Sequence, residues 1–247
     1  MTAFISPVEA RETVTCGRLN KQVTVEGKWT NVDEWTDAME ISLVFLQGSG
    51  KAYIKAKYDD NYLYLLVDFV SDQESQTSDM VVIAVDPKND GGLNPQKDDF
   101  TLSFTWNTPT QYVRLLGWGT GTEDLLWGDM GGAFNAAASN NVENDPYGKS
   151  PHLIYEFQIP VKLTSATGGG TFVMSPTGIG IGVSAYDRLA NSCLWPNGFD
   201  PGIPDKYAEM SFMTQVVPEF STAISVVLFL VLAVATIVLR HPANRKD

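Results

Sequence analysis

The chain has 247 residues, of which 44% are hydrophobic and 19% charged, so it is neither disordered nor wholly embedded in a membrane. Its net charge of −12 comes from 29 acidic and 17 basic residues and disfavours nucleic acid as a partner, because acidic surfaces repel phosphate backbones. Two cysteines and two histidines exclude a disulfide-dense scaffold, a zinc site of four cysteines and most histidine-rich metal sites.

We predict an N-terminal arm over residues 1–21 and one β domain over residues 22–214. Residues 1–10 contain neither a basic region nor an apolar run of export-signal length. For a domain outside the cytoplasm, we therefore expect either that the start has been trimmed or that insertion relies on the C-terminus alone. The first explanation is favoured.

Short strand-like runs follow one another along residues 21–213, with glycine, proline, Asn and Asp between them. Residues 52–58 partly alternate between polar and apolar, and residues 62–69 are almost entirely apolar. The turn residues Asp59-Asp60-Asn61 join them, which predicts a hairpin whose second strand is central in its sheet. Only residues 32–46 have a weak helical pattern. Further strands are expected at 80–85, 100–106, 112–118, 153–159, 179–186 and 207–213.

Many short strands separated by turn signals are typical of an all-β fold, and we predict an antiparallel β-sandwich of the jelly-roll or immunoglobulin-like kind. Two long loops are expected at residues 119–149 and 164–177, where binding sites on a rigid sandwich usually lie. Pro160 should end a strand. Gly180 and Gly182 lie where a bulge or a close approach of the backbone is needed.

Several motifs occur in an order that resembles one superfamily. The motifs are G-x-W…W at 27–35, D-D-x-x-L-Y at 59–64, a strand ending in Asp86, E-x-x-I-P at 156–160 and a glycine-rich strand at 179–183. The order resembles the family 9 carbohydrate-binding modules, whose superfamily includes DOMON-like domains and the haem-binding subunit of ethylbenzene-dehydrogenase-type enzymes. The resemblance covers residues 22–213 and implies an antiparallel β-sandwich. Trp29 and Trp35 are expected in the core.

The resemblance implies a non-catalytic module that binds carbohydrate or another surface polymer. An alternative is a structural or accessory subunit of an envelope layer or membrane complex, and a haem-binding redox subunit is the third hypothesis. Catalysis finds no support, because the sequence has no G-x-S-x-G, H-E-x-x-H or P-loop motif. We therefore expect a protein that is not an enzyme.

Sugar recognition needs flat aromatic rings flanked by polar groups. The expected loops at 119–149 and around residue 195 make Trp127 and Trp195 the best candidates for exposure. The alternative is that these rings pack in the core or within loops. The tryptophans that sandwich a terminal sugar in the resembled modules do not align with particular residues here. All the candidate tryptophans are Trp106, Trp118, Trp127 and Trp195.

An acidic loop at residues 86–99 predicts a calcium site. Calcium takes six to eight oxygen ligands, and Gly91-Gly92 permits a sharp turn. Lys88 and Lys97 exclude an EF-hand, and some members of the resembled family bind structural calcium. The alternative is a solvated hairpin loop with Asx-turns. The predicted ligands are Asp86, Asn89, Asp90, Asp98 and Asp99, and a weaker acidic cluster is Asp68, Asp72 and Glu74.

Other candidate ligands are few. The resembled haem subunit uses Met with Lys or His, for which His152, Met130 and Met174 are available. A single histidine beside Pro151 is usually a loop residue, so we expect no haem. Cys16 and Cys193 could form one disulfide between the N-terminal arm and a late loop.

The C-terminus predicts a membrane anchor. Residues 220–239 carry no charge, and as a helix they would span roughly 30 Å, the thickness of the hydrocarbon core. A buried core helix is the alternative. The basic tail at 240–247 should stay in the cytoplasm, which places residues 1–219 outside, on the far side of a linker at 215–219.

Pro218-Glu219-Phe220 directly precede the predicted span. This triplet, an apolar helix and a basic tail together resemble the PEF-type C-terminal sorting signal of archaeal surface proteins. That resemblance implies a sortase-like transpeptidase that cuts near the triplet. A permanent single-pass anchor is the alternative.

Overall fold

The structure is a computed structural model that describes residues 10–106, 112–117, 123–126, 134–164, 171–188 and 192–213. The chain divides into two units, 1–213 and 214–247, and every described residue belongs to the first. Within those described residues, no helix has the length and apolar character needed to cross a bilayer. The linker, the Pro218-Glu219-Phe220 triplet, the predicted span and the basic tail lie outside the described residues.

The described part is built almost entirely of strands, with a single short 3-10 helix, η2 (Pro204–Lys206). The strands are β1 (Thr13–Arg18), β2 (Met39–Ser42), β3 (Val44–Phe45), β4 (Tyr53–Tyr58), β5 (Tyr62–Phe69), β6 (Met80–Asp86), β7 (Phe100–Thr105), β8 (Tyr112–Gly117), β9 (Glu123–Leu126), β10 (Asn135–Ser139), β11 (Leu153–Pro160), β12 (Lys162–Thr164), β13 (Thr171–Val173), β14 (Gly178–Tyr186), β15 (Ser192–Trp195) and β16 (Ala208–Phe212).

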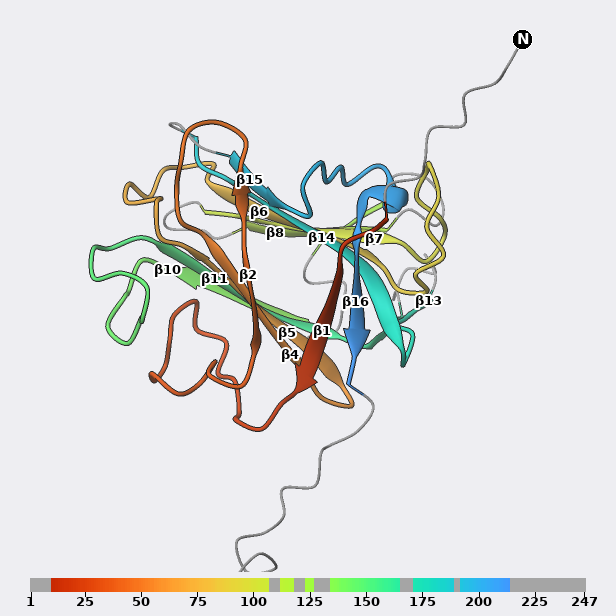
Figure 1. Cartoon of the computed structure of the whole chain (residues 1–247), viewed down its shortest axis with the longest axis horizontal. Helices are drawn as coiled ribbons and strands as arrows, with labels where there is room; N and C mark the ends of the chain where they lie inside the picture. Colours follow the sequence, from red (N-terminus) through yellow and green to blue (C-terminus); the bar gives the residue numbers. More distant parts are fainter. Residues whose placement is uncertain are drawn as a thin grey trace, which may run out of the picture. The chain divides into compact units, whose positions relative to one another are not determined.

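One layer of the sandwich has the strand order β10-β11-β5-β4, with β2 also paired to β4 (Figure 1). The predicted hairpin is confirmed: β4 and β5 are antiparallel, with Ile54 opposite Val67. In its turn, Asp59 Oδ1 accepts hydrogen bonds from the backbone N–H groups of Asn61 and Tyr62 at 2.7 and 2.8 Å. A local Asx-turn therefore sets the register of these two strands.

The other layer has the order β16-β14-β6-β7-β8-β9, with β15 beside β14 and β3 beside β15. β1 belongs to both layers, because Thr13–Cys16 pair with β16 and Gly17–Arg18 pair with β4 (Figure 1). Both β1 pairings are parallel, whereas the other strand pairs of the described part are antiparallel. The fold is therefore a mixed sandwich, and it begins before residue 22, within the segment predicted as an arm.

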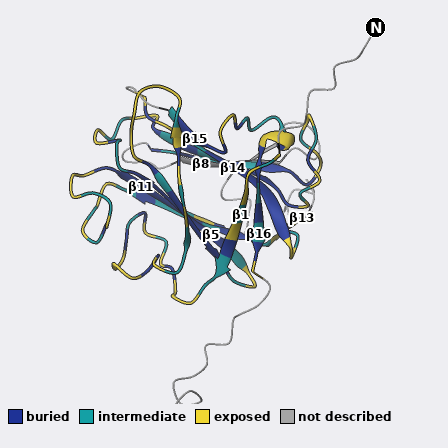
Figure 2. Cartoon of the chain, in the orientation of Figure 1, coloured by how far each residue is buried: buried dark blue, intermediate teal, exposed yellow. Residues whose placement is uncertain are grey.

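The core lies between the inner faces of the two layers. Phe104 of β7 contacts Tyr155 and Phe157 of β11 edge to face, with ring centroids 5.5 and 6.1 Å apart. The strands of both layers are mostly buried, whereas the connecting loops are mostly exposed (Figure 2). Burial of these apolar side chains is the main favourable term in the stability of the fold.

A second apolar cluster covers the outer face of the first layer. Trp29 and Trp35 are 2% and 0% exposed and pack with Tyr64, Leu66 and Ile154, so their predicted place in the core is confirmed. Because this cluster buries the face opposite the main core, β5 is apolar on both sides. That explains why its sequence does not alternate.

Residues 32–46 are not helical, so the weak helical pattern was wrong. The segment instead forms turns followed by β2 and β3. Tertiary contacts set its conformation, in place of the backbone hydrogen bonds of a helix. The fully buried Lys57 ammonium donates to Lys21 O at 2.8 Å, to Asp37 Oδ1 at 2.9 Å and to Glu34 O. It also lies 5.2 Å from the centre of the Trp35 ring.

The two predicted long loops both contain strands. β9 and β10 lie within residues 119–149, and β13 lies within residues 164–177. β10 reads Asn-Ala-Ala-Ala-Ser, which lacks the β-branched and aromatic residues that mark a strand. Its pairing with β11 decides its conformation, and the sequence alone could not reveal that partner.

The close backbone approach predicted for β14 is confirmed. A Cβ added at Gly182 would lie 2.1 Å from the ring of Phe199, and one added at Gly180 would lie 2.7 Å from Arg11 Nη2. Only glycine therefore lets Phe199 and Arg11 lie directly on the strand.

Candidate functional site

The acidic loop between β6 and β7 brings three of its predicted ligands together. Ligating oxygens of Asp86, Asp98 and Asp99 all lie within 4.8 Å of one another. The three residues are 0%, 7% and 0% exposed. Asp90 is exposed and lies outside this group, where its Oδ1 accepts a hydrogen bond from Gln96 Nε2 at 3.1 Å.

Asp86 organises the turn that follows it. Its Oδ1 accepts from the N–H of Asn89 at 2.7 Å, and its Oδ2 accepts from the N–H of Gly91 at 2.8 Å. Asn89, Gly91 and Gly92 have positive φ angles of 59°, 65° and 121°. The Asx-turn that the sequence left as an alternative is thus present, and it occupies one member of the acidic group.

Three side-chain oxygens of the loop have no hydrogen-bond partner. Asp98 Oδ2, Asp99 Oδ1 and Asn89 Oδ1 are buried and accept no hydrogen bond. Asp98 Oδ1 pairs with Lys88 at 3.1 Å, but that lysine is 63% exposed. Burial raises the pKa of Asp99 to about 7, and the neighbouring Asp86 and Asp98 add to this effect. Three carboxylates grouped in this way, two of which keep a buried unpaired oxygen, suit a hard divalent cation.

A cleft of about 290 Å³ lies beside this loop. Asp205 belongs to its wall and accepts a hydrogen bond from the N–H of Gly92 at 2.7 Å. Charged and amide side chains in the cleft offer both donors and acceptors. The lining residues are Ala10, Arg11, Glu12, Pro196, Asn197, Asp205, Lys206 and Tyr207.

The expected exposure of Trp195 was wrong. Trp195 is 1% exposed, because β15 directs it into the core opposite Val183, and its Nε1 donates to Glu12 Oε1 at 2.7 Å. Trp106 is also buried, at 9% exposed. Neither ring offers a face to a sugar, so the packing alternative holds for both. Trp118 and Trp127 lie outside the described residues.

The expected disulfide is not formed. Cys16 and Cys193 are both free and buried, in β1 and β15, which are not neighbouring strands. Burial raises the pKa of both thiols, to about 12 for Cys193. Each cysteine therefore acts as a small apolar core residue.

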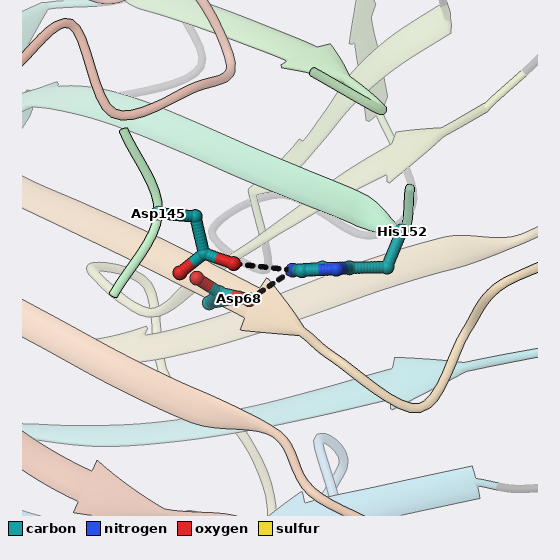
Figure 3. A group of neighbouring side chains, drawn as sticks. All are labelled: Asp68, Asp145 and His152. Carbon is teal, nitrogen blue, oxygen red and sulfur yellow. Dashed lines mark hydrogen bonds and ion pairs between the residues drawn. The ribbon is translucent and has the colours of Figure 1, made fainter. Parts of the chain in front are cut away.

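Three residues that the sequence did not group form a buried charged cluster (Figure 3). His152, expected as a loop residue, has a fully buried side chain, and its Nε2 lies 2.7 Å from Asp68 Oδ1 and 3.3 Å from Asp145 Oδ2. Burial alone would lower the pKa of His152, but its hydrogen bonds to Asp145 and Asp68 outweigh this and raise the pKa to about 10. Residues 68, 145 and 152 share no sequence pattern, so only the tertiary structure could reveal this cluster.

Glu156 is a second residue whose role the sequence reasoning missed. Its Oε2 accepts from the N–H groups of Glu26 and Gly27, both at 2.8 Å, and its Oε1 accepts from Trp35 Nε1 at 3.1 Å. A Cβ at Gly27 would lie 2.3 Å from the backbone of Ala138. The E-x-x-I-P and G-x-W…W motifs are therefore in direct contact. The presence of both motifs in the sequence was the signal that could have revealed the role of Glu156.

No known protein family matches the chain, and neither does any curated protein. Solved structures do match. The family 9 carbohydrate-binding module of Caldicellulosiruptor kristjanssonii with cellotriose is 14% identical, with a TM-score of 0.52, over 84% of this chain and 97% of that one. Its complex with glucose has a TM-score of 0.53 at 13% identity, over 84% of this chain and 100% of that one.

A candidate carbohydrate-binding protein from Bacteroides uniformis is 10% identical, with a TM-score of 0.52, over 83% of this chain and 100% of that one. The chain shares the fold of these modules. The β-sandwich implied by the motif order is thereby confirmed, but the expectation that it is purely antiparallel was wrong, because both pairings of β1 are parallel. At these identities the likeness concerns the fold, and ligand binding by this chain is a separate question.

Proposed function

We propose that this chain is a non-catalytic module that binds a carbohydrate or another surface polymer in the cleft beside the acidic loop. The observation that carries the proposal is the presence of that cleft on a fold shared with modules solved with cellotriose and glucose. A volume of about 290 Å³ is close to the ~300 Å³ lower limit of small-molecule pockets. It suits the end of a glycan chain better than a long segment.

The chemistry of the cleft supports a hydroxyl-rich ligand. Sugar hydroxyls both donate and accept hydrogen bonds, so they need acceptors such as Glu12 and Asp205 together with donors such as Arg11 and Asn197. Asn197 is exposed. Within this proposal, Trp118 or Trp127 supplies the aromatic ring on which the sugar stacks.

Calcium in the acidic loop is part of the same proposal. Asp86, Asp98 and Asp99 would supply carboxylate oxygens, and Asn89 would add its side-chain oxygen. A divalent cation would offset the like charges of three buried carboxylates and give the unpaired oxygens a partner. The ion would have a structural role and would lie next to the cleft wall to which Asp205 belongs.

The proposal also includes the cell surface as the place of action. We propose residues 220–239 as a single membrane span with residues 1–219 outside, and Pro218-Glu219-Phe220 as a sorting triplet for a sortase. Protease added to intact cells should degrade residues 1–213. Full protection of that part would contradict this orientation.

One observation favours a second function, as an accessory subunit of an envelope layer or membrane complex. Val44 in β3, Leu46 directly after β3 and Tyr186 in β14 are 45%, 59% and 43% exposed, and β15 lies between the two strands. Exposed apolar side chains that gather in this way are typical of protein contacts. Co-purification of one fixed protein from native membranes, without glycan retention, would favour this function.

Glycan binding is tested with the purified chain on an array of saccharides that includes cellotriose. We expect retention of at least one glycan, and at least a tenfold weaker affinity for Asn197→Ala. Asn20→Ala is the matched control, because Asn20 is exposed at the opposite end of β1. An array without hits would overturn the proposal, and equal affinities of the Asn197→Ala variant and the native chain would exclude this cleft.

A further inference from the structure

Asp68, Asp145 and His152 converge from three separate parts of the chain. Asp68 lies in β5, Asp145 lies in the loop after β10, and His152 directly precedes β11. One ligand atom of each lies within 4.8 Å of the other two, and all three side chains are 0% exposed (Figure 3). Two carboxylates and one imidazole therefore meet at a single point that is closed to bulk solvent.

The three donor atoms already lie close together, held by hydrogen bonds, and one pair would have to separate slightly around a metal ion. Zinc binds nitrogen and carboxylate oxygen at about 2.0–2.2 Å, so donors on a tetrahedral ion lie ~3.3–3.5 Å apart. The 3.3 Å between His152 Nε2 and Asp145 Oδ2 matches this spacing. The 2.7 Å between His152 Nε2 and Asp68 Oδ1 is a hydrogen-bond distance, which an ion would widen by about 0.6 Å. A metal ion would replace the hydrogen-bonding proton and bond to all three atoms at once.

Each ligand is already oriented by a partner of its own. His152 Nδ1 donates to Ser150 O at 2.8 Å, which leaves Nε2 as the ligating atom. Asp68 Oδ2 accepts from Trp29 Nε1 at 3.0 Å. Such hydrogen bonds to the far side of metal ligands fix their tautomer and direction in known metal sites.

Asp145 is held in the same way by its own loop. Its Oδ1 accepts from the N–H of Tyr147 at 2.7 Å, and its Oδ2 accepts from the N–H of Gly148 at 2.9 Å. The short loop that carries Asp145 is thereby folded around the carboxylate. The directions of the three ligand side chains are thus set before any ion arrives.

The charges also balance with a divalent ion. Two carboxylates and an imidazolium leave one net negative charge in a fully buried site, whereas two carboxylates, a neutral imidazole and a divalent cation leave none. Lys55 and Glu40 neutralise each other at 2.8 Å next to the Trp29 and Tyr147 rings, so that pair adds no net charge. Burial of an uncompensated charge is costly, so neutrality favours the ion.

We propose that Asp68, Asp145 and His152 form a binding site for a first-row divalent metal of the zinc class. The imidazole ligand separates this site from the all-oxygen acidic loop, because imidazole suits zinc and its neighbours whereas carboxylates and carbonyls suit calcium. The fourth tetrahedral position is left to a water molecule. Binding replaces the proton on His152 Nε2, and that proton is released to the solvent.

Because the site is closed, the ion enters while the chain folds, and its binding energy becomes part of the stability of the loop at 140–151. The test therefore unfolds the full chain with a chelator and refolds it with Zn²⁺ or Co²⁺, followed by desalting. We expect one Zn²⁺ per chain by elemental mass spectrometry. With Co²⁺ we expect the strong visible absorption of a tetrahedral complex, without cobalt–thiolate bands.

The variants His152→Gln and Asp145→Asn should lose this ion and its spectrum. Asp33→Asn, which removes an exposed carboxylate far from both acidic groups in the sequence, should keep both and serves as the matched control. Retention of metal by His152→Gln at the native level would overturn the proposal. If neither variant folds, the refolded native chain decides, because absence of bound metal or an octahedral Co²⁺ spectrum would overturn it.

Discussion

Asp205 and Gly92 exchange two hydrogen bonds. The N–H of Gly92 donates to Asp205 Oδ1 at 2.7 Å, and the N–H of Asp205 donates to Gly92 O at 3.0 Å. Gly91 packs against the same carboxylate so closely that a Cβ there would lie 2.7 Å from Asp205 Oδ1. Because Asp205 also lines the cleft, the acidic loop and the proposed ligand site share one wall.

Asp205→Ala should weaken calcium binding, although Asp205 is not among the grouped ligands. The loss of the Gly92 hydrogen bond would loosen the loop that holds the ion, and we expect a few-fold weaker affinity, equivalent to ~1 kcal/mol. Calorimetric titration with Ca²⁺ measures this. Asp205→Asn keeps an acceptor oxygen and should stay close to the native affinity. Equal loss in both variants would show that only the charge of Asp205 matters.

The metal-free chain should lose stability as the pH rises. The pKa of Asp99 is about 7 in the folded chain, raised by burial above the ordinary value near 4, so the folded state holds the proton more tightly. Its contribution is complete below about pH 4 and is lost as the pH rises towards about 7, by up to ~1.4 kcal/mol per pH unit. Thermal unfolding with EDTA at about pH 5 and about pH 8 measures this loss.

Calcium should reverse this trend, because it binds the ionised carboxylate. Asp99→Asn should reduce the pH dependence in EDTA and abolish the gain from calcium, whereas the exposed Asp33→Asn should do neither. Part of the pH dependence should remain, because burial also raises the pKa of Asp72 and of Glu156 to about 7. The same pH slope with calcium as with EDTA would show that no ion fills the acidic loop.

Gly182→Ala should destabilise the second layer. The new Cβ would lie 2.1 Å from the Phe199 ring, which would have to move, at a cost of ~1–3 kcal/mol. Urea unfolding measures the change. Gly17→Ala is the matched control within a strand, because its Cβ would meet only Asp37 O at 3.5 Å. In a Phe199→Ala background the cost at Gly182 should shrink, and an unchanged cost would mean that the ring is not its cause.

Glu156→Ala should destabilise the chain more than Glu156→Gln. Alanine leaves the N–H groups of Glu26 and Gly27 and the Trp35 indole without their acceptor, at ~1–3 kcal/mol for each buried donor. Glutamine keeps an oxygen for the two backbone donors and loses only the bond to Trp35. Denaturant unfolding of both variants tests this order, and similar losses would mean that the charge of Glu156 is what matters.

Features set by neighbouring residues were predictable. The turn at Asp59-Asp60-Asn61 and the apolar runs beside it specify the β4–β5 hairpin through local geometry. The grouping of acidic residues was also predictable, because one loop between β6 and β7 brings Asp86, Asp98 and Asp99 together. The order of the motifs predicted the fold, which the similar solved structures share.

Features that depend on distant partners were decided only by the tertiary structure. The exposure of Trp195 depends on which face of β15 meets the core. The parallel pairings of β1 depend on β4, about 40 residues further along the chain, and on β16, nearly 200 residues away. The cluster of Asp68, Asp145 and His152 forms only when β5, the loop after β10 and the residue before β11 meet. The residue pattern of a segment predicts the local geometry of that segment. These contacts arise from packing between distant segments, which the periodicity of neither segment predicts.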